Sequence, residues 1–476
     1  MGIHLPPNVA LVLTIAFIVF LFRRDIRERP DVTVALWLPL FWMLLVFSRP
    51  LSEWLSIFGL PGFGASTLEE GSPLDAGVYF GLAAAGAWVL YRRQASLSEI
   101  VRNNQWLTIF LLYCLVSIVW SDFPLVAFKR WIKVLGHPIM ALIVITEPDP
   151  DEAIKRLMKR CAYIVVPVSI LFIKYYPQWG RSFDQWSGMA MNNGIAVGKN
   201  MLGADCFILG YFFFWHLLDT WRQPRSKARR KELLLIAGFG CMIWWLLSTA
   251  HSSTSIISLF VGITFLLLIG GPFMNRNFVG TFILAAGVLI AVAELGFGLS
   301  GYVAATMGKD PTFTGRTELW QQLFGFHTNS VFGTGFESFW LGDRIRRFFE
   351  LYRWHANEAH NGYLETYLNL GLIGLFLMIG LFIATFWKSR RELFENFQFG
   401  RFRLGFLVAI IVYNWTEAAF KNVSPTWFVF YIIALDYPMA QLRPADSPVD
   451  TRDSAEDWKL IYAESLDMSD RRSVKS

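Results

Sequence analysis

Apolar runs of about the length that crosses a bilayer recur along almost the whole chain, separated by polar segments. A membrane-spanning helix needs ~20 predominantly apolar residues. The pattern predicts about thirteen spans, near residues 7–22, 32–48, 74–91, 105–120, 131–146, 161–176, 200–218, 232–249, 254–270, 277–295, 363–387, 404–420 and 426–440. In the fifth, Trp131 to Lys133 could instead lie flat at the membrane interface. The predicted fold class is therefore all-α, a polytopic integral membrane protein with about 12–13 transmembrane helices in residues 1–440.

Composition supports this interpretation. The chain is 54% hydrophobic and 17% charged, whereas soluble domains carry about 25% charged residues. This excludes a soluble enzyme, a disordered chain and a disulfide scaffold. The four cysteines lie inside apolar runs, without the spacing of a metal site, and are interpreted as buried hydrophobes.

Basic residues predict the orientation in the membrane. Clusters follow each odd-numbered span: Arg23, Arg24, Arg27 and Arg29; Arg92, Arg93 and Arg102; Lys155, Arg156, Lys159 and Arg160; Arg222, Arg225, Lys227, Arg229, Arg230 and Lys231; Arg276; Lys388, Arg390, Arg391, Arg401 and Arg403. Because basic loops stay in the cytoplasm, the N-terminus is expected outside and the polar residues 441–476 inside, as a disordered tail. The net charge of +6 reflects these loops and does not indicate nucleic acid.

The external loop 296–362 is far longer than an ordinary connection, and such loops usually carry function. It holds an arginine group, Arg316, Arg344, Arg346, Arg347 and Arg353, with Trp340 and Trp354 nearby. Guanidinium groups bind phosphate oxygens two at a time, and aromatic rings suit the apolar faces of sugars. Alternatively, these arginines contact anionic lipid headgroups or form salt bridges within the loop.

His360 lies at the mouth of the eleventh span, where Asn361 is a plausible N-cap. A histidine at the water boundary can be neutral near pH 7 and accept a proton; the alternative is a structural role at the interface. Glu358 and Glu365 flank it, and either could orient it or serve as the base, although Glu365 could instead cap the first helical turn.

Three groups of motifs occur in one order along the chain. They are Gly315-Arg316-Thr317-Glu318-Leu319-Trp320, Gly333-Thr334-Gly335-Phe336-Glu337-Ser338-Phe339-Trp340, and His360-Asn361-Gly362-Tyr363-Leu364-Glu365 followed by Asn369-Leu370-Gly371. As a set they resemble the signature of the O-antigen ligase and polymerase superfamily. Trp120-Ser121-Asp122-Phe123-Pro124 and Val197-Gly198-Lys199-Asn200-Met201-Leu202-Gly203 are similar to its ExoQ-type exopolysaccharide polymerases.

The resemblance implies a bacterial inner-membrane glycosyltransferase with a GT-C-like fold that acts on the periplasmic side without a metal ion or other cofactor. It would transfer a glycan from undecaprenyl pyrophosphate to a hydroxyl of a second glycan. His360 would activate that hydroxyl, Arg316 would hold the pyrophosphate, and Lys199 could assist. Relatives often carry a cation where Ser253 stands here, so a second pyrophosphate ligand would have to be His251 or Lys199.

Further candidates complete the predicted substrate-binding set. Lys129 and Arg130 are expected outside and could approach the pyrophosphate, unless the fourth or fifth span is misplaced; Asn361 and Tyr363 belong to the same set through the third motif. Few charges lie within spans, and intramembrane carboxylates are functional candidates by default. Glu294 and Glu417 lie near external span ends and could simply be solvated there.

The favoured function is polymerisation of lipid-linked exopolysaccharide repeats, with membrane lipid as surroundings and flippase and chain-length regulator proteins as partners. An alternative is an O-antigen-type ligase that joins the finished glycan to lipid A core or protein. A transporter or flippase of lipid-linked sugars is an alternative of another class. The sequence shows no obvious internal repeat, which disfavours transporter folds built from paired halves.

Overall fold

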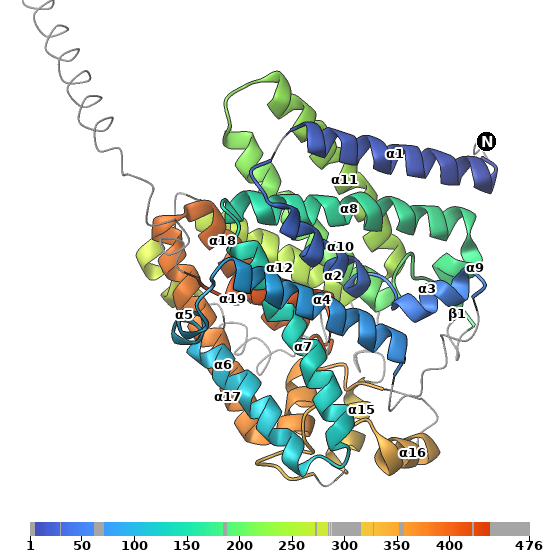
Figure 1. The fold of residues 1–476 in the computed structure, drawn as a ribbon, viewed down its shortest axis with the longest axis vertical. Coiled ribbons are helices and arrows are strands. Elements are labelled where there is room, and N and C mark those ends of the chain that lie inside the picture. The colour runs from blue at the N-terminus through green and yellow to red at the C-terminus, as the bar shows by residue number, and fades with distance from the viewer. Residues whose placement is uncertain are drawn as a thin grey trace, which may run out of the picture. The chain divides into compact units, whose positions relative to one another are not determined.

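The computed structural model describes residues 5–28, 30–60, 71–183, 188–271, 274–283, 285, 287, 316–326, 328–351, 357–420 and 423–437 (Figure 1). The expectations for Glu294, Arg353, Trp354 and the tail 441–476 fall outside these residues.

Helices dominate the described chain. The α-helices are α1 (Pro7–Arg27), α2 (Trp37–Val46), α3 (Leu51–Ile57), α4 (Pro73–Arg92), α5 (Leu97–Asn103), α6 (Gln105–Val116), α7 (Pro124–Ile145), α8 (Pro150–Tyr175), α9 (Pro177–Gly180), α10 (Lys199–Arg222), α11 (Lys227–Ala250), α12 (Ser253–Gly270), α15 (Arg316–Phe324), α16 (Gly342–Leu351), α17 (Gly362–Glu395), α18 (Phe397–Tyr413) and α19 (Pro425–Ala434). Short 3₁₀ turns are η1 (Val34–Leu36), η2 (Ser117–Trp120) and η3 (Arg276–Phe278). A two-stranded antiparallel ribbon, β1 (Arg181–Phe183) and β2 (Ala190–Asn192), pairs Arg181 with Asn192.

The helices confirm the all-α, polytopic membrane class. Each predicted span from 7–22 to 254–270, and from 363–387 to 426–440, coincides with one or more helices, while most of 277–295 lies outside the described residues. Five helices in the described residues are long and apolar enough to cross a membrane, or up to seven if each bent pair is one span. This number is below the predicted thirteen because other predicted spans correspond to short helices, or to helices such as α8 that carry several charges.

Two predicted boundaries shift. Residues 131–133 lie inside α7, which begins at Pro124, so they do not form a separate interfacial segment. The span predicted at 404–420 is a helix at 397–413. It extends through Arg401 and Arg403, which are buried over the rings of Phe397 and Phe399. Glu417 therefore lies beyond the end of α18 and not within it.

α10 lies in the middle of the bundle and contacts α8, α11, α12, α18 and α19 (Figure 1). Phe207 on α10 stacks on Phe406 and Tyr413 of α18, each with ring centroids 5.6 Å apart. Buried aromatic pairs of this kind contribute about 0.5–1.5 kcal/mol beyond their area. They fix the end of α18, and thus the turn that carries Glu417.

α17 is interrupted at Gly371, where φ is 65° and ψ is −163°. At this break, backbone groups of α17 form hydrogen bonds with the preceding loop instead of within the helix. Leu372 N–H donates to Ser330 O over 2.9 Å, and Gly335 N–H donates to Asn369 O over 2.8 Å. A Cβ at position 371 would lie 2.2 Å from Val331 O. Both the backbone conformation and the close contact therefore require glycine.

Gly371→Ala should lower the stability of the purified protein by about 1–3 kcal/mol, since alanine is strained at this φ and meets a backbone oxygen. Gly77→Ala on α4 is the matched control, because a Cβ there meets no atom within 4 Å. Denaturant unfolding in detergent measures both variants. Equal stability of the two would contradict the role given to Gly371.

Candidate active site

The guanidinium of Arg316 is held by the turn that follows α18. Its Nη2 lies 2.8 Å from Glu417 Oε1, and its Nη1 donates to the carbonyl oxygen of Thr416. The side chain of Glu417 is only 6% exposed. A buried carboxylate requires such a partner.

His360 faces the same carboxylate from the other side. Its Nδ1 lies 3.5 Å from Glu417 Oε2 and 3.1 Å from Glu358 Oε1. One oxygen of Glu417 thus faces the guanidinium and the other faces the imidazole. The two residues expected to carry the chemistry lie on either side of one buried carboxylate, although 44 positions separate them in the chain.

The backbone at His360 is in the left-handed region, with φ of 46°. Such a conformation is uncommon for a residue with a Cβ and persists where the surroundings hold it. Glu365 Oε2 accepts from Ala359 N–H over 2.8 Å, and Asn361 Oδ1 accepts from the N–H groups of Tyr363 and Leu364 over 3.0 Å. The predicted N-cap is confirmed, and His360 is fixed between two side-chain anchors.

One face of α15 positions both Arg316 and the segment that carries His360. Arg316 and Trp320 are four residues apart, so they lie on the same side of the helix. Trp320 Nε1 donates to Ala359 O over 2.9 Å. Leu319 and Leu323, fully buried, pack with Ala359, Leu364 and Leu368 in a small apolar core. This explains the spacing of Arg316 and Trp320 in the first motif.

Trp320→Phe should keep the packing but remove the donor to Ala359, and a hydrogen bond of this kind contributes about 1 kcal/mol. We expect roughly a fivefold to tenfold loss of turnover with an unchanged fold. Trp88→Phe is the control, because Trp88 is 60% exposed on α4. A variant as active as the control would show that this contact does not position His360.

Other predicted residues surround this cluster. Asn200, in the first turn of α10, places Nδ2 3.5 Å from Glu417 Oε2, and the predicted Lys199 directly precedes it. Thr254 of the serine-rich stretch bonds Thr416 through their hydroxyls at 2.6 Å. The two segments proposed to supply a second cation, at Lys199 and His251, thus border the Arg316–Glu417–His360 cluster.

The second motif packs against the third and against residues 117–130. Ser121 Oγ and Ser338 Oγ lie 2.6 Å apart. The predicted Arg130 donates from Nη1 to Glu337 O over 2.5 Å, so it binds the motif's backbone. Lys129 beside it is exposed. Residues 121–130 and the second motif therefore lie together.

Several predicted substrate-binding residues take part in loop structure. Arg344 Nη2 lies 2.8 Å from Asp122 Oδ2, and Trp340 Nε1 donates to Glu365 Oε1 over 2.8 Å. Tyr363 donates its hydroxyl to Ile411 O over 2.8 Å. All three side chains are engaged by groups of the protein, and the Arg344–Asp122 pair favours the salt-bridge alternative for Arg344.

Arg346 and Arg347 lie on the exposed face of α16. Arg346 pairs with Asp343 at 2.8 Å, and both side chains are largely exposed. Exposed pairs contribute little to stability, so both arginines remain accessible to anionic groups. The structure does not bring them into contact with His360 or Arg316.

Glu358, His360 and Glu417 offer ligand atoms within 4.8 Å of one another, so their donor set could hold a metal ion. Arg316 already binds Glu417, and its positive charge opposes a second cation at that carboxylate.

Comparison with known proteins identifies relatives of this part of the chain. A profile of the O-antigen ligase family matches residues 234–379, which include Arg316 and His360. The exopolysaccharide production protein ExoQ of Rhizobium meliloti (strain 1021) is 26% identical over 303 residues, covering 61% of this chain and 66% of ExoQ. Residues 234–379 thus match the O-antigen ligase family, and the chain is similar to ExoQ. The chain spans just under two thirds of the length of ExoQ.

The positions of two carboxylates of the candidate site, Glu417 and Glu365, differ from the expectations drawn from the sequence. Glu417 was expected near the end of a span, where solvation was one explanation for its charge, and its contact with Arg316 was not foreseen. Glu365 was an alternative base, but it is 3% exposed and accepts from Ala359, Trp340 and Asn369. Glu358, and not Glu365, lies against the imidazole.

Proposed function

We propose that the chain is an exopolysaccharide polymerase that transfers a glycan from undecaprenyl pyrophosphate to a hydroxyl of a lipid-linked repeat unit at the periplasmic face of the bacterial inner membrane. The observation that carries this proposal is the Arg316–Glu417–His360 cluster. It joins a group suited to a pyrophosphate with a group suited to deprotonating an alcohol.

In this mechanism His360 is the general base. Nδ1 lies 3.1 Å from Glu358 Oε1 and 3.5 Å from Glu417 Oε2 but makes no hydrogen bond within the described residues. The mechanism requires the proton of the neutral imidazole on this nitrogen, which leaves Nε2 as the acceptor. The side chain is 25% exposed, which leaves Nε2 room to meet a sugar hydroxyl. As the acceptor oxygen bonds the anomeric carbon of the donor, its proton passes to Nε2.

Arg316 stabilises the leaving group. The bond from the anomeric carbon to the pyrophosphate oxygen breaks, and the electron pair leaves with undecaprenyl pyrophosphate. A guanidinium has five N–H donors. Arg316 directs one donor to Thr416 O and one to Glu417, so the others remain for phosphate oxygens. Lys199, in the neighbouring first turn of α10, can add a second positive charge.

The resemblance to ExoQ favours a polymerase, and the O-antigen ligase profile keeps a ligase as the second candidate. The two differ in the acceptor: another lipid-linked repeat for the polymerase, and lipid A core or protein for the ligase. Both use the same donor chemistry and the same cluster.

Lipid-linked glycans extracted from a host that lacks the gene distinguish these functions. A missing polymerase should leave single repeats on the outer face of the inner membrane, whereas a missing ligase should leave long lipid-linked polymer. Single repeats trapped on the inner face would instead identify a flippase and contradict the proposal. Restoration by the wild-type gene is the control.

A further inference from the structure

An open cavity of about 1010 Å³ lies at the other end of the bundle from the Arg316–His360 site. α10 connects the two: Asn200 contacts Glu417, while Thr220, twenty residues later, lines the cavity. At a rise of 1.5 Å per residue these positions lie ~30 Å apart. The cavity is therefore separate from the proposed reaction centre.

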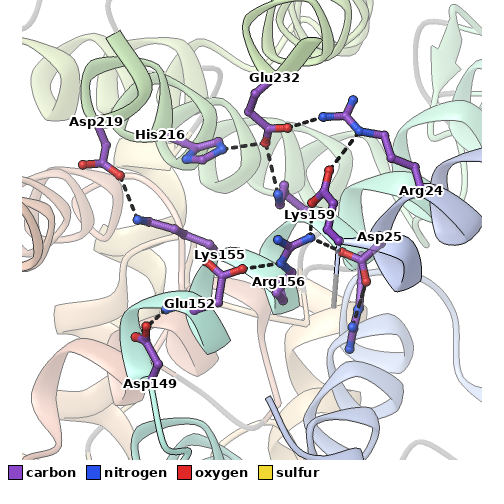
Figure 2. Close-up of polar contacts among 12 residues, drawn as sticks. Arg24, Asp25, Asp149, Glu152, Lys155, Arg156, Lys159, His216, Asp219 and Glu232 are labelled. Atoms are coloured by element: carbon purple, nitrogen blue, oxygen red, sulfur yellow. Dashed lines mark hydrogen bonds and ion pairs between the residues drawn. The ribbon is translucent and has the colours of Figure 1, made fainter. Parts of the chain in front are cut away.

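The floor of the cavity is an ion-pair network between α1, α8, α10 and α11 (Figure 2). Glu232 binds Arg24, Lys159 and His216; Arg156 binds Asp25, Glu28 and Glu152; Lys155 binds Asp219; and Arg160 binds Asp25. Five basic and five acidic side chains of the described residues thus neutralise one another, with His216 in addition. The network holds the four helices but leaves no excess charge of its own.

The rim carries the excess positive charge. Arg27, Arg229 and Lys231 also line the cavity, and none has an ion-pair partner in the described part of the chain. Arg229 lies over the ring of Trp221 and donates to its carbonyl, but its buried Nε finds no acceptor among the described residues. An anion at the rim would meet cations that no carboxylate neutralises.

Two deeply buried polar atoms on the cavity wall also lack partners. His216 Nδ1 and Thr220 Oγ1 make no hydrogen bond within the described residues, although these residues are only 5% and 1% exposed. Unpaired buried polar atoms are costly and rare. Both atoms have almost no exposed surface, so in this structure they do not contact a ligand held at the rim.

The walls away from the rim are apolar. On α11 they run from Leu234 to Met242, about 12 Å of helix, and on α1 they include Phe17 and Phe20. Phe20 is 62% exposed, as expected for a residue that faces acyl chains. Charge at one end and hydrocarbon along the length match a lipid and do not match a soluble anion.

We propose that this cavity binds the phosphate headgroup of an anionic phospholipid at the Arg27–Lys231 rim, with one acyl chain along the apolar wall between α1 and α11. Three basic clusters predicted to lie in the cytoplasm meet here, which assigns the lipid to the inner leaflet. The bound lipid would link α1 to α11, two helices that make few direct contacts with each other apart from the ion pairs. The proposal does not depend on the transfer reaction.

Native mass spectrometry of the full-length purified protein tests this site. The probes are phosphatidylglycerol and phosphatidylcholine with identical acyl chains, at equal concentration. We expect one phosphatidylglycerol to be retained in preference to phosphatidylcholine. The double variant Arg27→Glu/Lys231→Glu should lower this occupancy on the order of tenfold, because each basic residue near an anionic lipid contributes roughly 1 kcal/mol.

The matched control is Arg23→Glu/Arg230→Glu, which makes the same charge change on the same two helices outside the cavity. Equal retention of both lipids, equal loss in the test and control variants, or full displacement by inorganic phosphate would each overturn the proposal. The last result would identify a free phosphate site.

Discussion

Replacing His360 with alanine should lower the rate of glycan transfer by about 10²–10⁴-fold, the usual contribution of a positioned general base. The acceptor hydroxyl is a poor nucleophile, and the nearby carboxylates Glu358 and Glu417 lie at Nδ1 of the imidazole. The imidazole is partly exposed and its backbone is fixed by Glu365 and Trp320, so the truncation should leave the fold intact. Polymer formed from lipid-linked repeats by purified variant and wild type gives the ratio.

Free imidazole provides the control for this variant. If His360 acts as a base, added imidazole should restore part of the lost activity, since the side chain's place is open to solvent. A purely structural histidine would not be replaced in this way. Full activity of His360→Ala in protein of normal stability would remove the base from the mechanism.

Arg316→Ala should reduce transfer by about 10²–10³-fold, since a preorganised group at a developing negative charge contributes roughly 3–4 kcal/mol. Arg316→Lys should restore little of this. A lysine is a single point charge and cannot bind Thr416 O, Glu417 and a phosphate together as a guanidinium fork does. Initial rates at saturating donor separate this effect from weaker donor binding.

Glu417→Gln tests whether the guanidinium acts through the shared carboxylate. If the three residues act as a unit, the double variant Arg316→Ala/Glu417→Gln should raise the activation free energy of transfer by less than the sum of the two single variants. Arg102→Ala is the control, because the Arg102 side chain is 68% exposed and pairs with Glu99 outside the cluster. Wild-type rates for Arg316→Ala would contradict its role at the pyrophosphate.

The sequence predicted the all-α membrane class and identified Arg316 and His360 as candidate residues. Apolar runs report membrane helices directly because hydrocarbon leaves the backbone no other partner. Arg316 and His360 were found because their motifs are local. The N-cap at Asn361 also follows from neighbouring residues alone.

The contact of Arg316 and His360 with a shared carboxylate, Glu417, could not be predicted from the sequence. Glu417 meets Arg316 across 101 positions, and its place depends on α18 extending through Arg401 and Arg403, which hydropathy assigned to a loop. Long-range ion pairs leave no periodic pattern. For the same reason the sequence did not reveal that Arg344 pairs with Asp122 and that Trp340 donates to Glu365.

The most direct test of the central claim is transfer by the purified protein in lipid nanodiscs, supplied only with undecaprenyl-pyrophosphate-linked repeat units and a metal chelator. If Arg316 and His360 jointly bring a lipid diphosphate and a sugar hydroxyl to reaction, wild type should build a ladder of lengthening lipid-linked glycans, while His360→Ala and Arg316→Ala leave single repeats. An equal ladder from His360→Ala, or growth by wild type only when divalent metal is restored, would contradict the account.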